Sequence, residues 1–559
     1  MRPFVLLVAL AVASAGAPTG TANAQAAPTQ APPAAPRWLA DRPVFDVRAF
    51  GATGGGTAPD TRAIQAAIDS AGARGGAVVV LSGGTFLSGT LHLRSGVELR
   101  IEAGATLLGS PNRLDYTRAA DPVPIDDPAV TTFRPDYRRS GVLSLILAEN
   151  VTDVAITGGG TVDGQGLAVA RDTRRLLAEG VLVDPEWAAA RPAEINRPML
   201  LLVTRSRRVR VADATFRNAA NWVMNFGDSE DVAVDGVRVE STTYWNNDGI
   251  QISDSRRVRV AHSFVNAADD GICFKSSYAG GVTEDVVVEN NTVRSSASAL
   301  KFGTSSNGIF RNIRISNLRV YDTFRSAIAL EIVDGGLMED ITVDGVDARN
   351  TGNALFIRLG DRNPDREPGR LRRVLVRNVR VEVPLGPPDE GYPFPGPLLA
   401  ERHNLIPASI TGLPGHPVES VTLENVEIVV AGGGQTWRAN APLDSLAAVP
   451  ERAASYPEFS MFGELPAWGL YVRHVDGLTL RNVRLKLQAP DYRPAVVADD
   501  VRGLTVDGLA VPMPAAQASV PLVVLKDTDG ASLARVDAPV AREALRTQGR
   551  ATRLVSRGL

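Results

Sequence analysis

Short runs in which β-branched apolar residues alternate with polar residues recur along most of the chain. Residues 231–239 read DVAVDGVRV, residues 285–293 read DVVVENNTV and residues 312–320 read NIRISNLRV. Alternation with a period of two places apolar side chains on one side of a strand, whereas an amphipathic helix repeats about every 3.6 residues. No helical period competes within these runs, so each run predicts a short strand followed by a turn.

These predicted strands recur at a nearly constant interval. Taking the first apolar residue of each run as a marker, the steps are 26, 28, 27, 28 and 33 residues along the series Val232, Val258, Val286, Ile313, Ile341 and Val374. A period of about 20–30 residues built only of short strands and turns is typical of a parallel β-helix. Leucine-rich repeats have a similar period but would show a Leu-x-x-Leu-x-Leu frame, which these runs lack. We therefore expect an all-β chain folded as a parallel β-helix, with coils about 4.8 Å apart.

Three segments depart from the repeat. Residues 60–68 predict an N-terminal capping helix that begins after Asp60, with an apolar face formed by Ile64, Ala67 and Ile68. Residues 163–197 contain a helical stretch and are expected to be a loop excursion. Residues 384–417 are rich in Pro and Gly and predict a second insertion. Insertions in solenoids often rise from the binding face.

The N-terminus has the features of a secretory signal peptide. Arg2 precedes an apolar run over residues 4–15, and Ala22-Asn23-Ala24 fits a small-residue cleavage site. We therefore expect a signal peptide at 1–24 and a secreted or periplasmic protein. A disordered Pro/Ala-rich linker at 25–44, a β-helix catalytic domain at 45–540 and a C-terminal tail at 541–559 would follow.

Composition excludes several classes of partner. The net charge is −3 with acids and bases mixed along the chain, so no basic stripe indicates a nucleic-acid partner. No segment after the N-terminus predicts a membrane span. Cys273 is the only cysteine, so an intramolecular disulfide is impossible. The oligomeric state is left open by the sequence.

A repeated Asp-Gly-Ile is the clearest chemical signal. Residues 246–250 read NNDGI and residues 268–272 read ADDGI, so Asp248 and Asp270 should stack in successive coils, about 5 Å apart. Asp269 adds a third carboxyl, and repulsion predicts that at least one of the three has a raised pKa. A protonated carboxyl beside ionised ones is what glycoside hydrolysis requires. A ladder of turn aspartates and a calcium site are the other two interpretations.

These motifs resemble glycoside hydrolase family 28, the polygalacturonase-like enzymes with a right-handed parallel β-helix. The resemblance covers most of residues 45–380, and it includes FDVRAFGATGGGTAPDTRAIQAAID, LHLRSGVELRIEAGATLLGS, VAITGGGTVDGQG, NNDGI and DDGICFKS. It implies hydrolysis with inversion and without a cofactor. Asp269 would be the general acid, while Asp248 and Asp270 would position and deprotonate the water. Asn246 would hold a sugar hydroxyl or orient its neighbours.

The sequence departs from that family at two motifs. Where the family carries Gly-His-Gly, Ser298 takes the position of the histidine, whose role is vacant or passes to Lys301. By spacing, Glu331 stands where the family's Arg-Ile-Lys motif places its arginine. An acid there would repel a galacturonate carboxylate, so a neutral or deoxy sugar such as rhamnose, or a differently oriented uronate, fits this subsite better.

Other side chains on the same coils are candidates for substrate binding. The cations are Lys275, Lys301, Arg325 and Arg358. They can bind acidic sugars, and Lys301 can instead pair with Glu331 one coil on. Aromatic residues can stack on sugar rings or pack in the core, and Trp245 is the candidate chosen from the group Trp222, Tyr244 and Trp245.

The sequence thus predicts an exported glycosidase that acts on pectic polysaccharide, with rhamnogalacturonan or a rhamnose-containing substrate as one option. Two alternatives are kept. One is β-elimination like that of a pectate lyase, which uses calcium and a basic residue. The other is a carbohydrate-binding β-helix that has lost its catalytic chemistry.

Overall fold

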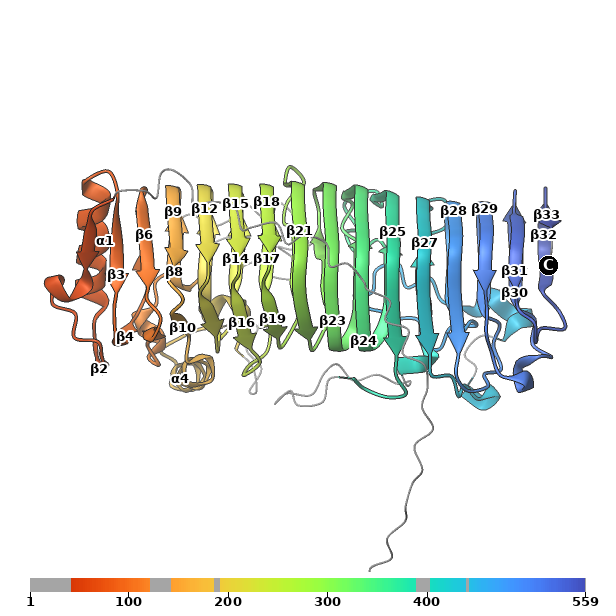
Figure 1. The fold of residues 1–559 in the computed structure, drawn as a ribbon, viewed down its shortest axis with the longest axis horizontal. Helices are drawn as coiled ribbons and strands as arrows, with labels where there is room; N and C mark the ends of the chain where they lie inside the picture. Colours follow the sequence, from red (N-terminus) through yellow and green to blue (C-terminus); the bar gives the residue numbers. More distant parts are fainter. Residues whose placement is uncertain (1–41, 121–141, 185–191, 389–402, 439–441, 558–559) are drawn as a thin grey trace, which may run out of the picture. The chain divides into compact units, whose positions relative to one another are not determined.

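The computed structural model describes residues 42–120, 142–184, 192–388, 403–438 and 442–557. Over these ranges 33 strands pair in parallel, so the prediction of a parallel β-helix is confirmed (Figure 1). The predicted signal peptide and most of the predicted linker lie outside the described residues. No helix in the described ranges is long and apolar enough to cross a membrane.

The strands form three ladders of parallel pairs, and the coils between the two ends of the solenoid contribute to all three. The first ladder contains the marker residues of the repeat, each paired with the next from Val232 to Val374. Its strands are β1 (Val44–Asp46), β3 (Ala77–Leu81), β6 (Val97–Ile101), β9 (Thr152–Thr157), β12 (Arg207–Ala212), β15 (Glu230–Asp235), β18 (Arg256–Ala261), β21 (Val282–Ser295), β23 (Ile309–Ile332), β24 (Leu337–Leu359), β25 (Arg370–Val383), β27 (Val418–Val430), β28 (Leu470–Leu487), β29 (Val496–Ala510), β31 (Ser532–Asp537) and β33 (Val555–Arg557).

The second ladder follows the first along each coil. Its separate strands are β2 (Gly55–Pro59), β4 (Gly84–Ser88), β7 (Ala105–Gly109), β10 (Thr161–Asp163), β13 (Thr215–Arg217), β16 (Arg238–Ser241) and β19 (Phe264–Ala267). From β21 onward the long strands continue into it without a break.

The third ladder carries the doubled acids at the start of its strands. Its strands are β5 (Leu91–His92), β8 (Ser144–Glu149), β11 (Met199–Thr204), β14 (Met224–Gly227), β17 (Ile250–Ser253), β20 (Ile272–Ser276), β22 (Leu300–Ser306), β26 (Ala408–Thr411), β30 (Val523–Asp529) and β32 (Leu545–Thr552). The end of β23 and β24 and the beginning of β28 and β29 complete it. Its outward side chains decide what a ligand at these acids can contact.

Alternation within each strand explains the core. Val234, Val260, Val288 and Ile315 stack from coil to coil and are buried without exposed surface. Their strand neighbours, such as Arg259, point outward and stay partly exposed. One continuous apolar column therefore runs through the coils, which is the pattern that the alternating sequence predicts.

The helices lie outside the ladders. They are α1 (Thr61–Ala73) and α4 (Gly166–Ala178), with short 3-10 turns η2 (Val47–Phe50), η3 (Arg113–Asp115), η4 (Glu194–Asn196), η5 (His403–Leu405), η6 (Thr436–Arg438), η7 (Leu443–Ala448) and η8 (Ala515–Gln517). Helix α1 buries the predicted face of Ile64, Ala67 and Ile68. Asp60 precedes it but accepts hydrogen bonds from the Thr53 and Gly54 amides instead of from the helix. The capping role of α1 stays a prediction.

The observed coils differ from the expected boundaries in three places. Strands β32 and β33 lie inside residues 541–559, expected as a tail, and pair with β30 and β31. Strand β26 lies inside the insertion expected at 384–417 and belongs to the third ladder. A further excursion between β27 and β28, over residues 431–469, was not anticipated. The terminal strands and β26 were not predicted because their sequences alternate only weakly. The excursion was not predicted because its sequence is irregular.

Candidate active site

The two Asp-Gly-Ile segments lie at the beginning of successive strands in the third ladder. Ile250 pairs with Ile272, and the Gly249 amide donates to the Asp270 carbonyl at 2.9 Å. Asp248 and Asp270 therefore occupy equivalent positions in adjacent coils, as the 22-residue spacing predicts. Both are nearly buried, with 3% and 5% of their surface exposed.

The glycines after these acids allow the coils to approach closely. A Cβ atom on Gly249 would lie 2.4 Å from a Val265 methyl, and one on Gly271 would lie 2.3 Å from a Val293 methyl. Both distances are far below van der Waals contact, so neither position accepts a side chain without displacement. The Asp-Gly pairing is thus explained by packing at the glycine, which leaves the preceding carboxyl free for another role.

Asp269 lies in a bend and stays partly exposed, unlike the two other acids. Its Oδ1 accepts the Asp270 amide at 2.9 Å, and the Asn246 side-chain nitrogen lies 3.5 Å from its Oδ2. Burial, reinforced by the charges of Asp248 and Asp270, raises the pKa of Asp269 to about 7. This carboxyl is therefore protonated in a large fraction of molecules at neutral pH and can donate a proton.

Asp248 forms an ion pair with the lysine that follows in β20. Lys275 Nζ donates to Asp248 Oδ2 and to Gln251 Oε1, each at 2.8 Å, and lies 4.2 Å from the centre of the Trp222 ring. Burial raises the pKa of Asp248, and Lys275 opposes that rise. Burial also disfavours the charged lysine, but the neighbouring acidic groups, Asp248 foremost, together outweigh that effect and raise the pKa of Lys275.

Asp270 contacts the next coil. Its Oδ1 accepts the Ser298 amide at 3.0 Å, and its Oδ2 lies 4.0 Å from Lys301 Nζ. Ser298 was expected as a substrate-binding side chain; it is 2% exposed, and its observed contact with the site is through this amide.

Lys301 and Glu331 form the ion pair that the sequence left as one possibility. Lys301 Nζ lies 3.3 Å from Glu331 Oε1, and each side chain is 1% exposed. Burial raises the pKa of Glu331 to about 7, although Lys301 lowers it. The predicted repulsion between Glu331 and a uronate carboxylate is therefore offset by an ammonium in contact with it.

Arg325 brings a third cation to the acids, and its charge lowers the pKa of Asp269 against the effect of burial. The Tyr456 ring stands 5.9 Å from the Arg325 guanidinium and 5.3 Å from Lys301 Nζ. Tyr456 was missed in the sequence because it lies in an irregular segment far from the acids along the chain. No local motif could have identified it.

Arg197 binds the segment that precedes the first Asp-Gly pair. It was not identified as a site residue from the sequence. It is fully buried, and it donates to Asn246 Oδ1 at 2.7 Å and to the Trp245 carbonyl at 2.8 Å. Asn246 itself has a positive φ of 54°, a conformation that asparagine tolerates better than most residues. The Arg197 contact thus orients Asn246 toward Asp269, while the Trp245 ring stays partly exposed.

Arg358, expected among the substrate-binding cations, has a different role. It is 1% exposed and donates to the carbonyls of Gly412 and Glu451. Burial lowers its pKa to about 10. It therefore fixes the main chain of a distant loop.

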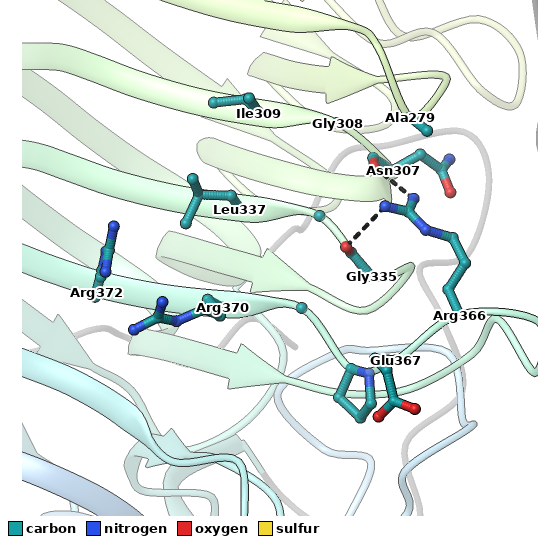
Figure 2. A pocket seen from close by; sticks show the side chains of 13 residues that line it. Ala279, Asn307, Gly308, Ile309, Gly335, Leu337, Arg366, Glu367, Arg370 and Arg372 are labelled. Carbon is teal, nitrogen blue, oxygen red and sulfur yellow. Dashed lines mark hydrogen bonds between the residues drawn. The ribbon is translucent and has the colours of Figure 1, made fainter.

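A cavity of about 570 Å³ lies away from the three acids, beside the turns at Gly308, Gly336 and Gly369. Figure 2 shows Arg366 directed across it toward Asn307 and Gly335, whose carbonyls it binds at 2.6 and 3.1 Å. The cavity contains no pair of carboxyls. In the described ranges, no group of three or more His, Cys, Asp or Glu side chains is arranged to hold a metal.

The structure thus gathers most of the predicted site residues around one set of strand ends. The cluster combines a partly exposed carboxyl of raised pKa with two buried carboxyls, each near an ammonium. Such a set can deliver a proton to an oxygen and accept one from water.

Comparison with protein families gives two matches. Residues 110–324 match the model of glycosyl hydrolases family 28, and residues 44–130 match a model described as rhamnogalacturonase A/epimerase, pectate lyase-like. The first match contains Asp248, Asp269 and Asp270.

Two curated bacterial proteins are similar over part of the chain. An exo-poly-α-D-galacturonosidase of Dickeya chrysanthemi is 25% identical over 391 residues, covering 61% of this chain and 63% of that protein. An endo-polygalacturonase of Pectobacterium carotovorum subsp. carotovorum is 24% identical over 307 residues, covering 53% of this chain and 71% of that protein. The chain therefore spans less than two thirds of the length of the first relative.

Two solved structures share the fold. An exopolygalacturonase from Thermotoga maritima gives a TM-score of 0.53 at 21% identity, covering 70% of this chain and 88% of that one. A family 28 exopolygalacturonase of Yersinia enterocolitica gives 0.51 at 18% identity, covering 92% of this chain and 78% of that one.

Proposed function

We propose that this chain, which matches the model of glycosyl hydrolases family 28 over residues 110–324, is a member of that family and hydrolyses glycosidic bonds in a pectic polysaccharide. The observation that carries the proposal is the cluster of Asp269, Asp248 and Asp270. Asp269 combines partial exposure with a pKa of about 7, as a general acid requires, and the two others are nearly buried beside it.

The proposed reaction is a single displacement with inversion. The Asp269 carboxyl transfers its proton to the glycosidic oxygen as the bond from that oxygen to the anomeric carbon breaks. A water attacks the anomeric carbon from the opposite side and gives its proton to the carboxylate of Asp248 or Asp270. The products are a shortened chain and a sugar with inverted configuration, and solvent then restores both protonation states.

The charges around the acids support an acidic substrate. Lys275 and Lys301 offset Asp248 and Glu331, which leaves Arg325 as a cation near Asp269. We propose that a uronate carboxylate lies on the Arg325 side. A rhamnose unit next to the cleaved bond remains part of the proposal. Lys301 neutralises the charge of Glu331, but Glu331 itself does not attract an acidic sugar.

The lyase alternative is weaker on the same geometry. The ammonium of Lys275 already contacts one oxygen of Asp248 at 2.8 Å, and its positive charge would repel a calcium ion bound to that carboxylate. We also propose export, which rests on the N-terminal sequence at 1–24 alone.

The test measures new reducing ends released from homogalacturonan, rhamnogalacturonan and rhamnose-capped oligosaccharides. Wild type should release them with inverted configuration by NMR, without ultraviolet-absorbing products and without sensitivity to a chelator. Asp269→Asn should lose at least about 100-fold of the rate.

Asp254→Asn is the matched control. Asp254 is also buried, with a pKa raised by burial to about 7, but it lies after β17 and binds Ser276 and Ser277. Its variant should keep the wild-type rate. A silent wild type, or an Asp269→Asn protein as active as the wild type, would remove the three acids from the proposed role.

A further inference from the structure

Along the axis of the solenoid, the outward side chains of the third ladder change from apolar to polar and then back to apolar. Four adjacent coils present Asn225, Gln251, Cys273 and Lys301, each paired in register with the next. The coils before them present Leu147 and Leu202, and the coils after them begin with Ala329 and Phe356. The polar stretch spans roughly 14 Å at the usual spacing of parallel coils, and apolar side chains stand before and after it.

The apolar coils before the polar stretch are covered. Leu147 and Leu202 pack in a separate buried cluster with Ala119, Val142 and Met199, and Trp222 packs against that cluster. Ala119 and Val142 lie in the segment between η3 and β8, so part of the ladder surface on this side is already covered by the chain itself.

The apolar coils after the polar stretch are covered by residues 442–468, which we call the strap. Its side chains bury Ala329, Phe356, Tyr471, Val497 and Val524 in a second separate cluster, through Leu446, Val449, Phe459, Phe462, Leu465 and Ala467. The strap therefore covers the outward surface of the third ladder on the coils that carry these five ladder side chains.

The strap is held to the coils by hydrogen bonds as well as by packing. Arg358 donates to the Glu451 carbonyl and Arg473 donates to the Val449 carbonyl, each at 2.7 Å. The Asp361 amide donates to the Ala453 carbonyl at 2.8 Å. Hydrogen bonds from guanidinium groups to main-chain carbonyls are stronger than those between neutral groups. We therefore expect the strap to keep a fixed position over the coils.

Each covered flank ends in an aromatic ring over a lysine. On one side Lys275 Nζ lies 4.2 Å from the centre of the Trp222 ring, and on the other Lys301 Nζ lies 5.3 Å from that of Tyr456. Tyr456 is 51% exposed although it belongs to the strap. The three acids thus lie between these two covered flanks, each of which has an aromatic ring on the side nearest the acids.

We propose that these two flanks restrict the site to the end of a polysaccharide, so that the protein removes units from chain ends instead of cutting within the chain. A polymer that extended along the axis past the acids would run into the Trp222 side or the strap. Tyr456 closes the site on the strap side and stacks on the terminal unit. The inference rests on the proposed hydrolysis of pectic polysaccharide at the same acids.

The first experiment compares viscosity with reducing ends during hydrolysis of homogalacturonan and rhamnogalacturonan by wild type. Release of mono- or disaccharide from the earliest times, with viscosity falling slowly, is the expected result. A rapid loss of viscosity with oligomers of many lengths would overturn the inference and leave the proposed function intact. Release of nothing from either polymer would instead refute the proposed function, and this inference with it.

The second experiment measures binding, which does not depend on turnover. Asp269→Asn is titrated calorimetrically with galacturonate and rhamnogalacturonan oligomers of two to eight units, and affinity should stop rising after the first few units. Affinity that keeps increasing with length would indicate a site open at both ends.

Tyr456 is tested in the same titration. Tyr456→Ala in the Asp269→Asn background should weaken binding at least about tenfold, and Tyr456→Phe should restore it. Tyr278→Ala is the aromatic control, because Tyr278 binds Asp228 beyond the opposite end of these strands. Equal affinity of the Tyr456→Ala and parent proteins would show that the ring is not part of the site.

Discussion

Replacing Lys301 by methionine should destabilise the protein in a way that depends on pH. Lys301 and Glu331 are each 1% exposed and lie 3.3 Å apart. At an effective dielectric constant of 20 their attraction is about 5 kcal/mol, which is comparable to the cost of dehydrating the two ions. The intact pair is therefore near break-even, whereas Glu331 left alone as a buried anion would cost about 3–5 kcal/mol.

Glu331 can reduce that cost by taking a proton, and this determines the pH dependence. Its pKa is already raised by burial from 4.5 to about 7, and Lys301 is the group that opposes the rise. Without Lys301 the pKa rises further, so the folded protein retains a proton that the unfolded chain has lost. This contribution to stability falls by about 1.4 kcal/mol per pH unit above pH 4.5 in both proteins. The fall ends near pH 7 in wild type and continues to the higher folded pKa in the variant, so the extra loss of the variant appears above about pH 7.

The assay is thermal unfolding between pH 5 and pH 8.5. Lys301→Met should lie close to wild type at pH 5 and well below it at pH 8.5, and Lys301→Met/Glu331→Gln should regain most of the loss. Lys486→Met, which removes a lysine with an exposed position on β28, is the control and should match wild type throughout. The reasoning would be refuted if Lys301→Met lost no additional thermal stability at high pH. It would also be refuted if Lys301→Met/Glu331→Gln were as unstable as Lys301→Met.

Three further predictions concern the acids and their supports. The rate should fall as pH rises through about 7, because Asp269 must hold a proton to act as an acid; a kcat profile without that basic limb would contradict the assignment. Lys275→Met should move the acidic limb of the same profile to higher pH, since the ammonium lowers the pKa of Asp248, and an unmoved limb would exclude Asp248 as the base. Gly271→Ala should cost on the order of 1–3 kcal/mol by denaturation, because its Cβ would lie 2.3 Å from a valine methyl. Gly227→Ala, whose Cβ would meet nothing closer than 3.9 Å, should be nearly neutral, so similar losses in both would show that crowding is not the cause.

The fold could be predicted from the sequence because coil packing is a local, repeated requirement. Each marker residue from Val232 to Val374 pairs directly with the marker of the next coil. Alternation with a period of two can bury only one side of a strand, and the interval sets the length of a coil. Boundaries were less accurate where the alternation weakens, as in β32 and β33.

The acids could be predicted for the same reason, since equivalent positions in adjacent coils must stack. Asp248 and Asp270 are placed by register alone, and the ion pair of Lys301 with Glu331 was one of two outcomes that spacing allowed. The sequence did not show which outcome would hold, because that depends on side-chain direction and burial.

The period and the alternation of the chain determined the β-helix, its core and the line of strand ends where the carboxyls gather. Only the tertiary structure decided what surrounds them. Arg197 reaches Asn246 from one excursion and Tyr456 reaches Lys301 from another, and neither segment has a period that the rest of the chain repeats. A solenoid repeats the contacts between neighbouring coils, so its sequence records them. A loop that folds back over the coils is positioned by packing and by hydrogen bonds to distant arginines, and those contacts leave no pattern in its own sequence.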